Sequence, residues 1–504
     1  MESFTPFVSS LGLSFAFSLG PMIASSLGPY FAAAPSFGRL IARANWIFFW
    51  YYAGSTISYI ALMILAFSYS RRHTKAAPAR NLALSRGVLP RVTIIAPAKN
   101  EEACILGAAR AFLELDYPNL EVLFVDDEST DATFELLHKN YDLELDDSQI
   151  VSKLPHRPIL SVWRSSRDPR LVVVRKLSAG CKGDANNAAL EIASGEYALM
   201  TDTDSLLEKD AVRCMVSVVL EDPGTIAVGG SVHAVNGCDV ARGQLRAIRS
   251  PRRYFEFAQV IEYARAFFMS RLGFSFLNMT PIISGALGLF RTDVLRAVGG
   301  YANCLAEDMD MTFKIHRYIL ANNLSSRIGF APDAKVWTEV PPNYRYVARQ
   351  RARWHNSLCE VLWGFRGMLF RPQYGRVGFV LLPWLWIYEL LVPLVESIAW
   401  ISILLAAILG RLNGTFALLI LGGGYGLTIL FSILSIRQSE RNYPRYPAPE
   451  KMKLILLAAL EVFPFRFLHV FWRLRGQIDY FRGDRRWRPI PRLGFENADT
   501  KGAD

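Results

Sequence analysis

Two short apolar runs in the first half of the chain each end in side chains that could bind a ligand. The first run ends before Pro97 and Glu101, and the second ends before Asp126 and Asp127. If both runs are strands of an open parallel sheet, their carboxyl ends form one edge, where such sheets bind ligands. Carboxylates at that edge can accept hydrogen bonds from a nucleobase or a ribose. Each motif alone could equally cap the helix that follows it.

A third apolar run ends in two aspartates separated by one residue, Asp202-Thr203-Asp204. Carboxylate oxygens suit Mg²⁺ or Mn²⁺, and such an ion can bridge to a diphosphate and neutralise charge as the diphosphate leaves. Asp-x-Asp alone is a weak signal, because it occurs in many surface turns, but its place directly after an apolar strand strengthens it. We therefore predict that Asp202 and Asp204 bind Mg²⁺ or Mn²⁺.

The fourth constellation is divided between two helical segments. Glu307 and Asp308 open a helical pattern, where a carboxylate can cap the helix or act as a general base on an acceptor hydroxyl. Gln350, Arg353 and Trp354 follow further along the chain. In that run the arginine could hold a departing diphosphate and the tryptophan could stack on a sugar. The arginine-rich run alone also suits a helix at a membrane surface.

The elements that must position these residues follow an α/β pattern. β-rich runs at 91–96, 121–125, 171–174 and 197–201 alternate with helical patterns such as 101–115. This alternation predicts a mostly parallel sheet. We interpret residues 137–170 as a polar insertion or a long connection. The aromatic segment 254–276 is either a helix packed within the domain or an interfacial helix.

Apolar segments flank the α/β region on both sides. The uncharged segment 45–70 is long enough to cross a hydrocarbon core of ~30 Å, and the basic residues after it place that end in the cytoplasm. Residues 454–471 include charged side chains that disfavour a lipid-facing span. The predicted organisation is a membrane-associated segment at 1–44, a transmembrane helix at 45–70, a cytoplasmic catalytic domain with interfacial helices at 89–370, a transmembrane region at 378–436, an interfacial helix at 454–471 and a basic cytoplasmic tail at 473–504.

The charge and cysteine content narrow the function further. The chain has 504 residues and a formal net charge of +11 at pH 7. The basic residues cluster beside the apolar segments, so a cytoplasmic membrane surface explains the charge better than nucleic acid does. We therefore expect no nucleic-acid partner. The cysteines show no CxxC spacing and no neighbouring His pair, which argues against a zinc site.

The order of these motifs along the chain resembles that of family-two glycosyltransferases with the GT-A (Rossmann-like) α/β fold. The motifs are Asp-Asp, Asp-x-Asp, Glu-Asp and Gln-x-x-Arg-Trp. The likeness runs from about Arg91 to Trp354 and looks closest to membrane-integrated synthases of poly-N-acetylglucosamine, hyaluronan and cellulose. It implies a GT-A catalytic domain inserted between transmembrane helices, in a multi-pass protein of the bacterial inner (cytoplasmic) membrane. Two positions depart from the family: Asn186 stands where Leu is frequent, and Ala306 where Thr is frequent. Neither departure removes a catalytic group.

The resemblance also implies a role for each matching residue. By this resemblance, the uridine would be held by Pro97, Glu101 and Asp127, Lys182 would lie near the nucleotide, Asp202 would contact the diphospho-sugar and Asp204 would ligate the metal. Asp308 would act as catalytic base with Glu307 beside it. The acceptor and diphosphate site would be lined by Gln350, Arg353 and Trp354, and an acceptor-side turn would be formed by Ser284 and Gly285. The aromatic segment 254–276 would then help to form the entrance of a membrane channel.

We expect a hexosyltransferase that takes sugar from a UDP-sugar donor by direct displacement with inversion. An α-linked donor would give a β-linked product, which we expect to be a polysaccharide. The alternative is a non-processive transferase whose acceptor is a membrane lipid rather than a saccharide. A membrane scaffold with an inactive domain is a third reading, against which the intact Asp202, Asp204, Asp308 and Arg353 argue. An accessory export subunit could be a further partner.

Overall fold

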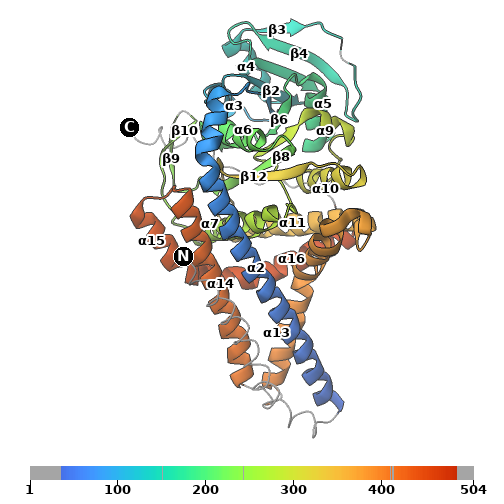
Figure 1. Cartoon of the computed structure of the whole chain (residues 1–504), viewed down its shortest axis with the longest axis vertical. Helices are drawn as coiled ribbons and strands as arrows, with labels where there is room; N and C mark the ends of the chain where they lie inside the picture. Colours follow the sequence, from blue (N-terminus) through green and yellow to red (C-terminus); the bar gives the residue numbers. More distant parts are fainter. Residues whose placement is uncertain (1–35, 150, 242, 409, 411–413, 485–504) are drawn as a thin grey trace. The chain divides into compact units, whose positions relative to one another are not determined.

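Strands buried on both faces form the centre of a ten-stranded sheet, in the order β3-β4-β5-β2-β1-β6-β11-β8-β12-β7 (Figure 1). A separate two-stranded sheet pairs β9 with β10. The strands are β1 (Val92–Ala98), β2 (Leu120–Asp127), β3 (Leu143–Asp146), β4 (Ile159–Ser165), β5 (Leu171–Lys176), β6 (Tyr197–Met200), β7 (Leu206–Leu207), β8 (Thr225–Ala234), β9 (Asp239–Ala241), β10 (Gln244–Ala247), β11 (Gly288–Arg291) and β12 (Arg327–Thr338).

The computed structural model describes residues 36–149, 151–241, 243–408, 410 and 414–484. The chain divides into two units, Met1–Ser58 with Val392–Thr428, and Tyr59–Leu391 with Ile429–Asp504. The second unit contains both sheets and every candidate site residue.

The four strands expected from the sequence, β5, β2, β1 and β6, are parallel neighbours. Beyond them the sheet is mixed, because β11 is antiparallel to both β6 and β8. The expectation of a mostly parallel sheet is therefore correct only for the centre. Residues 137–170 are also more than an insertion or a connection: they contain β3 and β4, and β4 extends the sheet antiparallel to β5. The buried side chain of Val162 on β4 accounts for this extension, since it packs into the core with Val172 and Val174 of β5.

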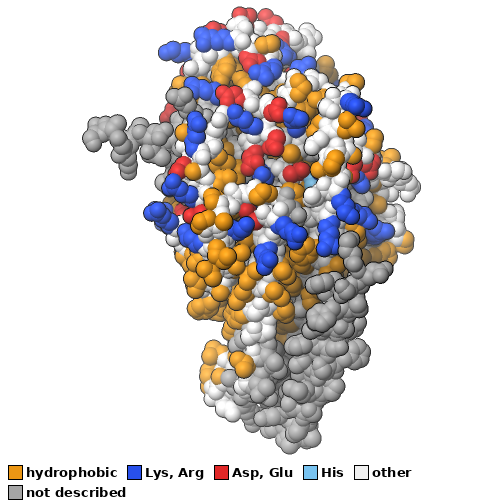
Figure 2. All heavy atoms as spheres, turned by 60° about the vertical axis from the view of Figure 1, so that its left-hand side comes forward, with side chains coloured by type: hydrophobic (Ala, Val, Ile, Leu, Met, Phe, Trp, Pro, Cys, Tyr) orange, Lys and Arg blue, Asp and Glu red, His pale blue; other side chains and the backbone are white. Residues whose placement is uncertain are grey.

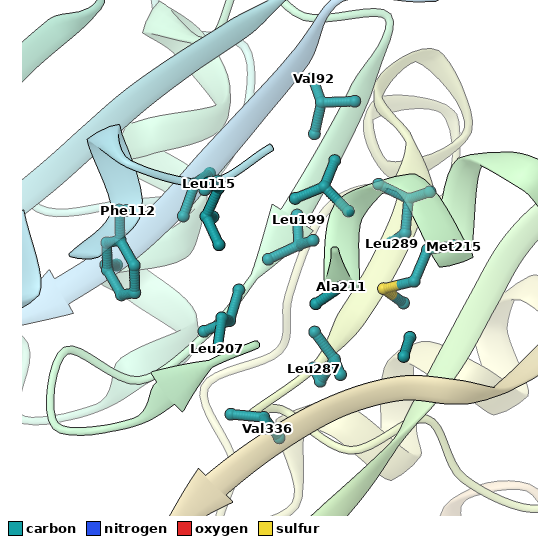
Figure 3. Close-up of a cluster of buried hydrophobic side chains, with 14 of the residues drawn as sticks. Val92, Phe112, Leu115, Leu199, Leu207, Ala211, Met215, Leu287, Leu289 and Val336 are labelled. Atoms are coloured by element: carbon teal, nitrogen blue, oxygen red, sulfur yellow. The ribbon is translucent and has the colours of Figure 1, made fainter. Parts of the chain in front are cut away.

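Successive side chains of β1 point to opposite faces of the sheet, as a strand requires. Ile94 belongs to one buried cluster and Ile95 to another. Figure 3 shows the first cluster, in which Phe112, Leu199 and Met215 come from α3, β6 and α6. The helices that cover this face are α3 (Ile105–Leu113), α4 (Thr133–Tyr141) and α6 (Ala211–Glu221), and those on the other face are α5 (Lys182–Ile192), α9 (Thr292–Ala297) and α10 (Glu307–Ala321).

The aromatic segment is helical, as expected, and consists of three consecutive pieces. These are α7 (Tyr254–Arg265), the π-helical η1 (Ala266–Arg271) and α8 (Leu272–Phe276). Phe267 and Phe268 are buried in the core cluster that includes α6. This packing favours the interpretation of a helix within the domain. A role at a membrane channel stays a prediction.

A further helix, α11 (Tyr344–Gly364), carries the Gln350–Trp354 run. Its first turn is capped by the Asn343 side chain, which accepts a hydrogen bond from the Tyr346 amide. Short helical turns follow at η2 (Arg366–Met368), η3 (Pro372–Tyr374), η4 (Val377–Leu381), α12 (Leu382–Leu385) and η5 (Trp386–Leu390).

Further helices, several of them long and apolar, precede and follow the sheet in the chain. They are α2 (Ser36–Arg86), α13 (Val392–Ile408), α14 (Gly414–Asn442), α15 (Ala448–Glu461), η6 (Val462–Arg466) and α16 (Phe467–Phe481). Among the described residues, three continuous helical stretches are long and apolar enough to cross a membrane, judged by length and composition only: Trp46–Arg86, Val377–Ile408 and Ala448–Phe481. The last of these contains the segment predicted to be interfacial, 454–471.

The exact domain boundaries remain predictions. Most of the predicted N-terminal segment and the end of the predicted basic tail, residues 1–35 and 485–504, lie outside the described residues.

On the face drawn in Figure 2, acidic and basic side chains are interspersed over the upper part, and hydrophobic side chains gather below a row of Lys and Arg.

Candidate active site

The carboxyl ends of β1, β2 and β6 lie at one edge of the sheet, because these strands are parallel neighbours. Pro97 at the end of β1 lies opposite Val125, and its carbonyl accepts a hydrogen bond of 2.8 Å from Thr203 Oγ1. This bond joins the loop after β1 to the Asp202-Thr203-Asp204 turn. The sequence correctly placed three of its motifs at one edge, as the topology rule for open sheets predicts.

Asp202, the first residue of the Asp-x-Asp motif, is engaged by a lysine from α5. Lys182 Nζ lies 2.5 Å from Asp202 Oδ1 and donates a hydrogen bond of 2.9 Å to the carbonyl oxygen of Gly285. Burial lowers the pKa of the Lys182 ammonium, but Asp202 and Glu307 outweigh this effect, so that the pKa is raised overall. Lys182 is therefore a fixed positive charge between the β6 edge and the turn at Gly285.

Asp308 meets the same turn from the start of α10. The Gly285 amide donates a hydrogen bond of 3.3 Å to Asp308 Oδ2, and Asp308 Oδ1 accepts one of 2.7 Å from the Met309 amide. A methyl group on Gly285 would lie 3.5 Å from Lys182 Nζ and 3.7 Å from Glu307 Oε1. Lys182, Gly285, Glu307 and Asp308 thus converge on one point.

Glu307 is buried beside Asp308 and carries a strongly shifted pKa. Burial and the neighbouring Asp308 carboxylate raise the pKa of Glu307 to about 7, although Lys182 acts in the opposite direction. A carboxyl group that titrates near neutral pH can exchange protons at working pH, and such groups are frequent at catalytic sites. The first turn of α10 therefore holds an acid, Glu307, that titrates near neutral pH.

Arg353 of α11 faces these acids. Burial lowers the pKa of its guanidinium, while Glu307, Asp308 and Asp202 partly restore it. Arg353 is half-buried, and α11 presents it together with its neighbours Gln350 and Trp354. Gln350 Oε1 accepts a hydrogen bond of 2.5 Å from Arg351, and the Trp354 side chain is 41% exposed. An exposed indole beside a half-buried guanidinium suits sugar stacking next to an anion.

The predicted nucleotide-binding acids form a second group. Asp127 is buried and accepts hydrogen bonds from Lys176 Nζ at 2.9 Å and Ser178 Oγ at 2.7 Å. Asp126 accepts from the Ser129 amide at 3.0 Å and lies 3.2 Å from Arg175 Nε. Both carboxylates therefore already have protein partners.

Glu101 lies after β1, where its Oε2 accepts from Cys104 Sγ at 3.0 Å. Burial raises the pKa of the Cys181 thiol, which lies directly before Lys182, and is the largest effect on it. The negative charges of Asp184, Asp127 and Glu307 raise this pKa further. This shared influence indicates that Asp127 and Glu307 both lie near the start of α5.

The donor set at the Asp-x-Asp turn fits a divalent cation held jointly with a diphosphate. Asp204 is 7% exposed, and carboxylate oxygens are the ligands that Mg²⁺ and Mn²⁺ prefer. Within the described ranges, no group of three or more His, Cys, Asp or Glu residues could hold a metal alone. Mg²⁺ is commonly bound by one or two carboxylates with substrate phosphates completing its shell. The residues therefore fit an ion that arrives with a nucleotide.

Three charged residues of this region received no individual role from the sequence. Lys176 ends β5 and is fully buried between Asp127 and Asp184. Arg351 is buried and pairs with Glu262 of α7 at 2.5 Å. Arg271, at the end of η1, lies close enough to Asp308 for that carboxylate to affect its pKa. A charge within an aromatic run was an available signal for Arg271 alone.

Comparisons with known proteins agree with this geometry. Residues 93–299 match the family model "Glycosyl transferase family 2", and residues 197–417 match the model "Glycosyl transferase family group 2". A probable glycosyltransferase YdaM of Bacillus subtilis is 25% identical over 309 residues, which cover 60% of this chain and 63% of that protein.

Poly-β-1,6-N-acetyl-D-glucosamine synthases are also similar. The Staphylococcus epidermidis synthase is 25% identical over 275 residues, covering 54% of this chain and 55% of that protein. The Staphylococcus aureus synthase is 24% identical over 315 residues, covering 62% and 63%. The similarity thus spans between 55% and 63% of the length of these curated relatives.

Two solved structures have lower global similarity. The mannosyltransferase PcManGT from Pyrobaculum calidifontis, in complex with GDP-Man and Mn²⁺, has a TM-score of 0.49 at 21% identity, covering 84% of this chain and 99% of that chain. S. aureus TarS 1-349 with UDP-GlcNAc has a TM-score of 0.38 at 15% identity, covering 79% and 93%. Because both TM-scores lie below 0.5, the assignment rests on the observed sheet and the family models. This chain carries a glycosyltransferase domain of family 2, with the GT-A-like α/β fold expected from its sequence.

Proposed function

We propose that this protein is a membrane-bound inverting glycosyltransferase that uses a UDP-sugar donor and extends a β-linked polysaccharide. The observation that supports this most is the convergence of Lys182, Glu307 and Asp308 around the Gly285 turn, with Asp202 paired to Lys182. This arrangement sets a proton acceptor and a cation beside the turn at Gly285, and the same cation contacts Asp202 of the Asp-x-Asp motif. Inverting transfer needs both of these groups within reach of one sugar carbon.

The donor would bind across the ends of β1, β2 and β6. Pro97, Glu101, Asp126 and Asp127 would surround the nucleoside, and Lys182 and Asp202 would orient the diphospho-sugar. A divalent cation held by Asp204, with Asp202, would neutralise diphosphate charge. Mg²⁺ and Mn²⁺ are both compatible with this donor set.

The chemical step is a direct displacement at the anomeric carbon. Asp308 removes the proton of an acceptor hydroxyl, and the resulting oxygen forms a bond to the anomeric carbon. The bond from that carbon to the diphosphate oxygen breaks on the opposite face, and its electron pair leaves with UDP. Arg353 stabilises the charge that develops on the leaving group. An α-linked donor then gives a β-linked product.

The acceptor would lie against α11 and the Ser284-Gly285 turn. The exposed Trp354 offers a flat surface on which a sugar ring can stack, and Gln350 offers amide hydrogen bonds. We propose a saccharide as the acceptor, since the poly-N-acetylglucosamine synthases that resemble this chain are named for a polymer. A membrane lipid acceptor is the competing possibility.

The three apolar helices support a membrane location, which we propose to be the bacterial inner membrane with the catalytic domain in the cytoplasm. Basic residues directly after residue 70 support this orientation through the excess of positive charge on cytoplasmic sides. Nucleotide-sugars would then reach the Asp-lined edge of the sheet directly.

A donor screen in purified membranes tests the proposed function. Membranes containing the protein should release UDP from one UDP-sugar, with UDP-N-acetylglucosamine tested first because of the named product of the relatives. The sugar should appear in a high-mass polymer that an enzyme specific for β-linkages degrades. A single labelled glycolipid would support the lipid-acceptor alternative. No UDP release from any donor would contradict the proposal.

A further inference from the structure

We propose that Arg271 binds an oxygen of the acceptor sugar next to Asp308. This inference rests on the proposed function, because it assumes that an acceptor hydroxyl is deprotonated by Asp308. None of the motifs discussed above includes Arg271. It lies at the end of η1, in the aromatic segment that links α7 to α8.

The Arg271 side chain is oriented by an aromatic ring and has an unused donor. Its guanidinium carbon lies 3.8 Å from the centroid of the Phe267 ring, a distance typical of a cation–π contact. Its Nη1 atom is buried and has no hydrogen-bond partner among the described residues. A buried donor without an acceptor costs free energy, so such groups in native proteins usually meet a ligand or a water. Nη1 therefore marks a place where an oxygen is expected.

Two other arginines of the same region show what a purely structural role looks like. Arg265, on α7, donates to both carboxylate oxygens of Glu461 at 2.8 Å. Arg351, on α11, lies 2.5 Å from Glu262 Oε2. In the described part of the chain, no carboxylate lies within ion-pair distance of Arg271. Its positive charge is thus not neutralised by a direct ion pair as the other two are.

The electrostatic surroundings indicate which oxygen Arg271 would meet. Burial lowers the pKa of Arg271 to about 10, and the Asp308 carboxylate and Tyr263 counteract this change, so the side chain stays charged at neutral pH. Asp202 and Glu307 act on Arg353 but are not among the groups that act on Arg271. Three carboxylates therefore act on Arg353, whereas Asp308 is the carboxylate that acts on Arg271.

These different electrostatic surroundings divide the two arginines by function. Arg353 would hold the departing diphosphate, and Arg271 would donate a hydrogen bond to an acceptor oxygen while Asp308 removes the proton.

Kinetics with a defined acceptor test this assignment. The probes are UDP-N-acetylglucosamine and a β-1,6-linked N-acetylglucosamine tetrasaccharide, and the readouts are the acceptor KM, kcat and the Kd of UDP from calorimetry. For Arg271→Met we expect the acceptor KM to rise about 10- to 100-fold, the range for losing a hydrogen bond to a charged group. The Kd of UDP should stay within about twofold, which also shows that the domain is folded. Arg271→Lys should recover part of the acceptor affinity, because it keeps the charge.

Arg72→Met is the matched control, since Arg72 also lies over a ring, that of Phe276 at 4.6 Å, but is exposed. It should change neither constant. An unchanged acceptor KM in Arg271→Met would overturn the inference, and so would a loss of UDP affinity as large as the rise in acceptor KM. In either case, release of UDP by the wild-type protein would leave the proposed function standing. A wild-type protein that releases no UDP from any nucleotide-sugar would overturn both.

Discussion

The main-chain amide of Gly285 donates a hydrogen bond of 3.3 Å to Oδ2 of Asp308. This bond links the turn before β11 to the first turn of α10, so the proposed base is oriented by backbone rather than by another side chain. Because the carbonyl of the same glycine accepts from Lys182, one residue fixes both the base and the cation. Backbone contacts of this kind hold a catalytic group more rigidly than two flexible side chains could.

Gly285→Ala should retain the fold and lose activity. The added methyl group would lie 3.5 to 3.7 Å from Lys182, Asp308 and Glu307, which is ordinary van der Waals contact. We therefore expect an unchanged melting temperature but a fall in kcat of about 10-fold or more, because the methyl group occupies the space beside the reacting groups.

Gly300→Ala is the contrasting variant. Gly300 has a φ of +70°, and its added methyl group would lie 2.4 Å from Asn187 Oδ1. This variant should lose about 1–3 kcal/mol of stability from backbone strain, and more from the clash. Equal loss of melting temperature in the two variants would show that the space around Gly285 is not as open as the structure indicates.

Lys176→Met should destabilise the domain and weaken nucleotide binding. Lys176 is 0% exposed and lies 2.9 Å from Asp127 and 2.5 Å from Asp184, so its removal leaves two buried carboxylates without the cation that they share. Breaking a buried ion pair by removing one partner costs about 3–5 kcal/mol. Thermal melting and the Kd of UDP measure the two effects.

Adding Asp184→Asn to Lys176→Met removes one of the two unpaired charges. We expect this double variant to recover part of the melting temperature. Because Asp127 would still lack its lysine, UDP affinity should stay lower than in the wild type. Full recovery of UDP affinity would mean that Lys176 does not position Asp127.

The raised pKa of Glu307 predicts a pH dependence of stability. In the unfolded chain this carboxyl titrates near its ordinary value of 4.5, and in the folded protein its pKa is about 7. The folded state therefore binds more protons between these values, and stability should fall as pH rises from about 4.5 through 7. Glu307→Gln should flatten that part of the curve in a denaturation series at several pH values.

The same ionisation should be visible in activity. The pH profile of UDP release should show an ionisation near 7 that Glu307→Gln removes. An unchanged profile in this variant would assign the ionisation to another group.

Chelation should abolish transfer reversibly. If Asp204 holds a divalent cation together with the diphosphate, excess EDTA stops UDP release, and added Mg²⁺ or Mn²⁺ restores it. Asp204→Asn should require a higher metal concentration for half-maximal rate. Full activity of the wild type in EDTA would contradict the metal assignment.

The sequence was sufficient for the centre of the fold. The runs that became β1, β2, β5 and β6 are apolar, and those of β1, β2 and β6 lie before acidic residues, so a common edge for these three motifs followed from the topology of parallel sheets. The first turn of α10 was equally predictable, because Glu307 and Asp308 precede a helical pattern.

Other features depended on tertiary contacts. β11 has only four residues, and its antiparallel place between β6 and β8 has no local signal. Lys176 at the end of an apolar strand resembles any lysine at a strand terminus, and only the fold shows the two carboxylates around it. The role proposed for Arg271 likewise depends on Asp308, which lies in a different helix, α10.

The most direct test of the account is the activity of Asp308→Asn beside Asp310→Asn, measured in the same membranes as transfer of labelled sugar from the active UDP-sugar into polymer. Asp310 lies in the same helical turn but pairs with Lys314 at 3.0 Å, so it controls for loss of a negative charge in α10. The account predicts that Asp308→Asn lowers transfer at least about 100-fold, in line with removal of a general base, while its UDP affinity and the activity of Asp310→Asn stay close to those of the wild type. Full transfer by Asp308→Asn with normal UDP binding would contradict the proposed mechanism.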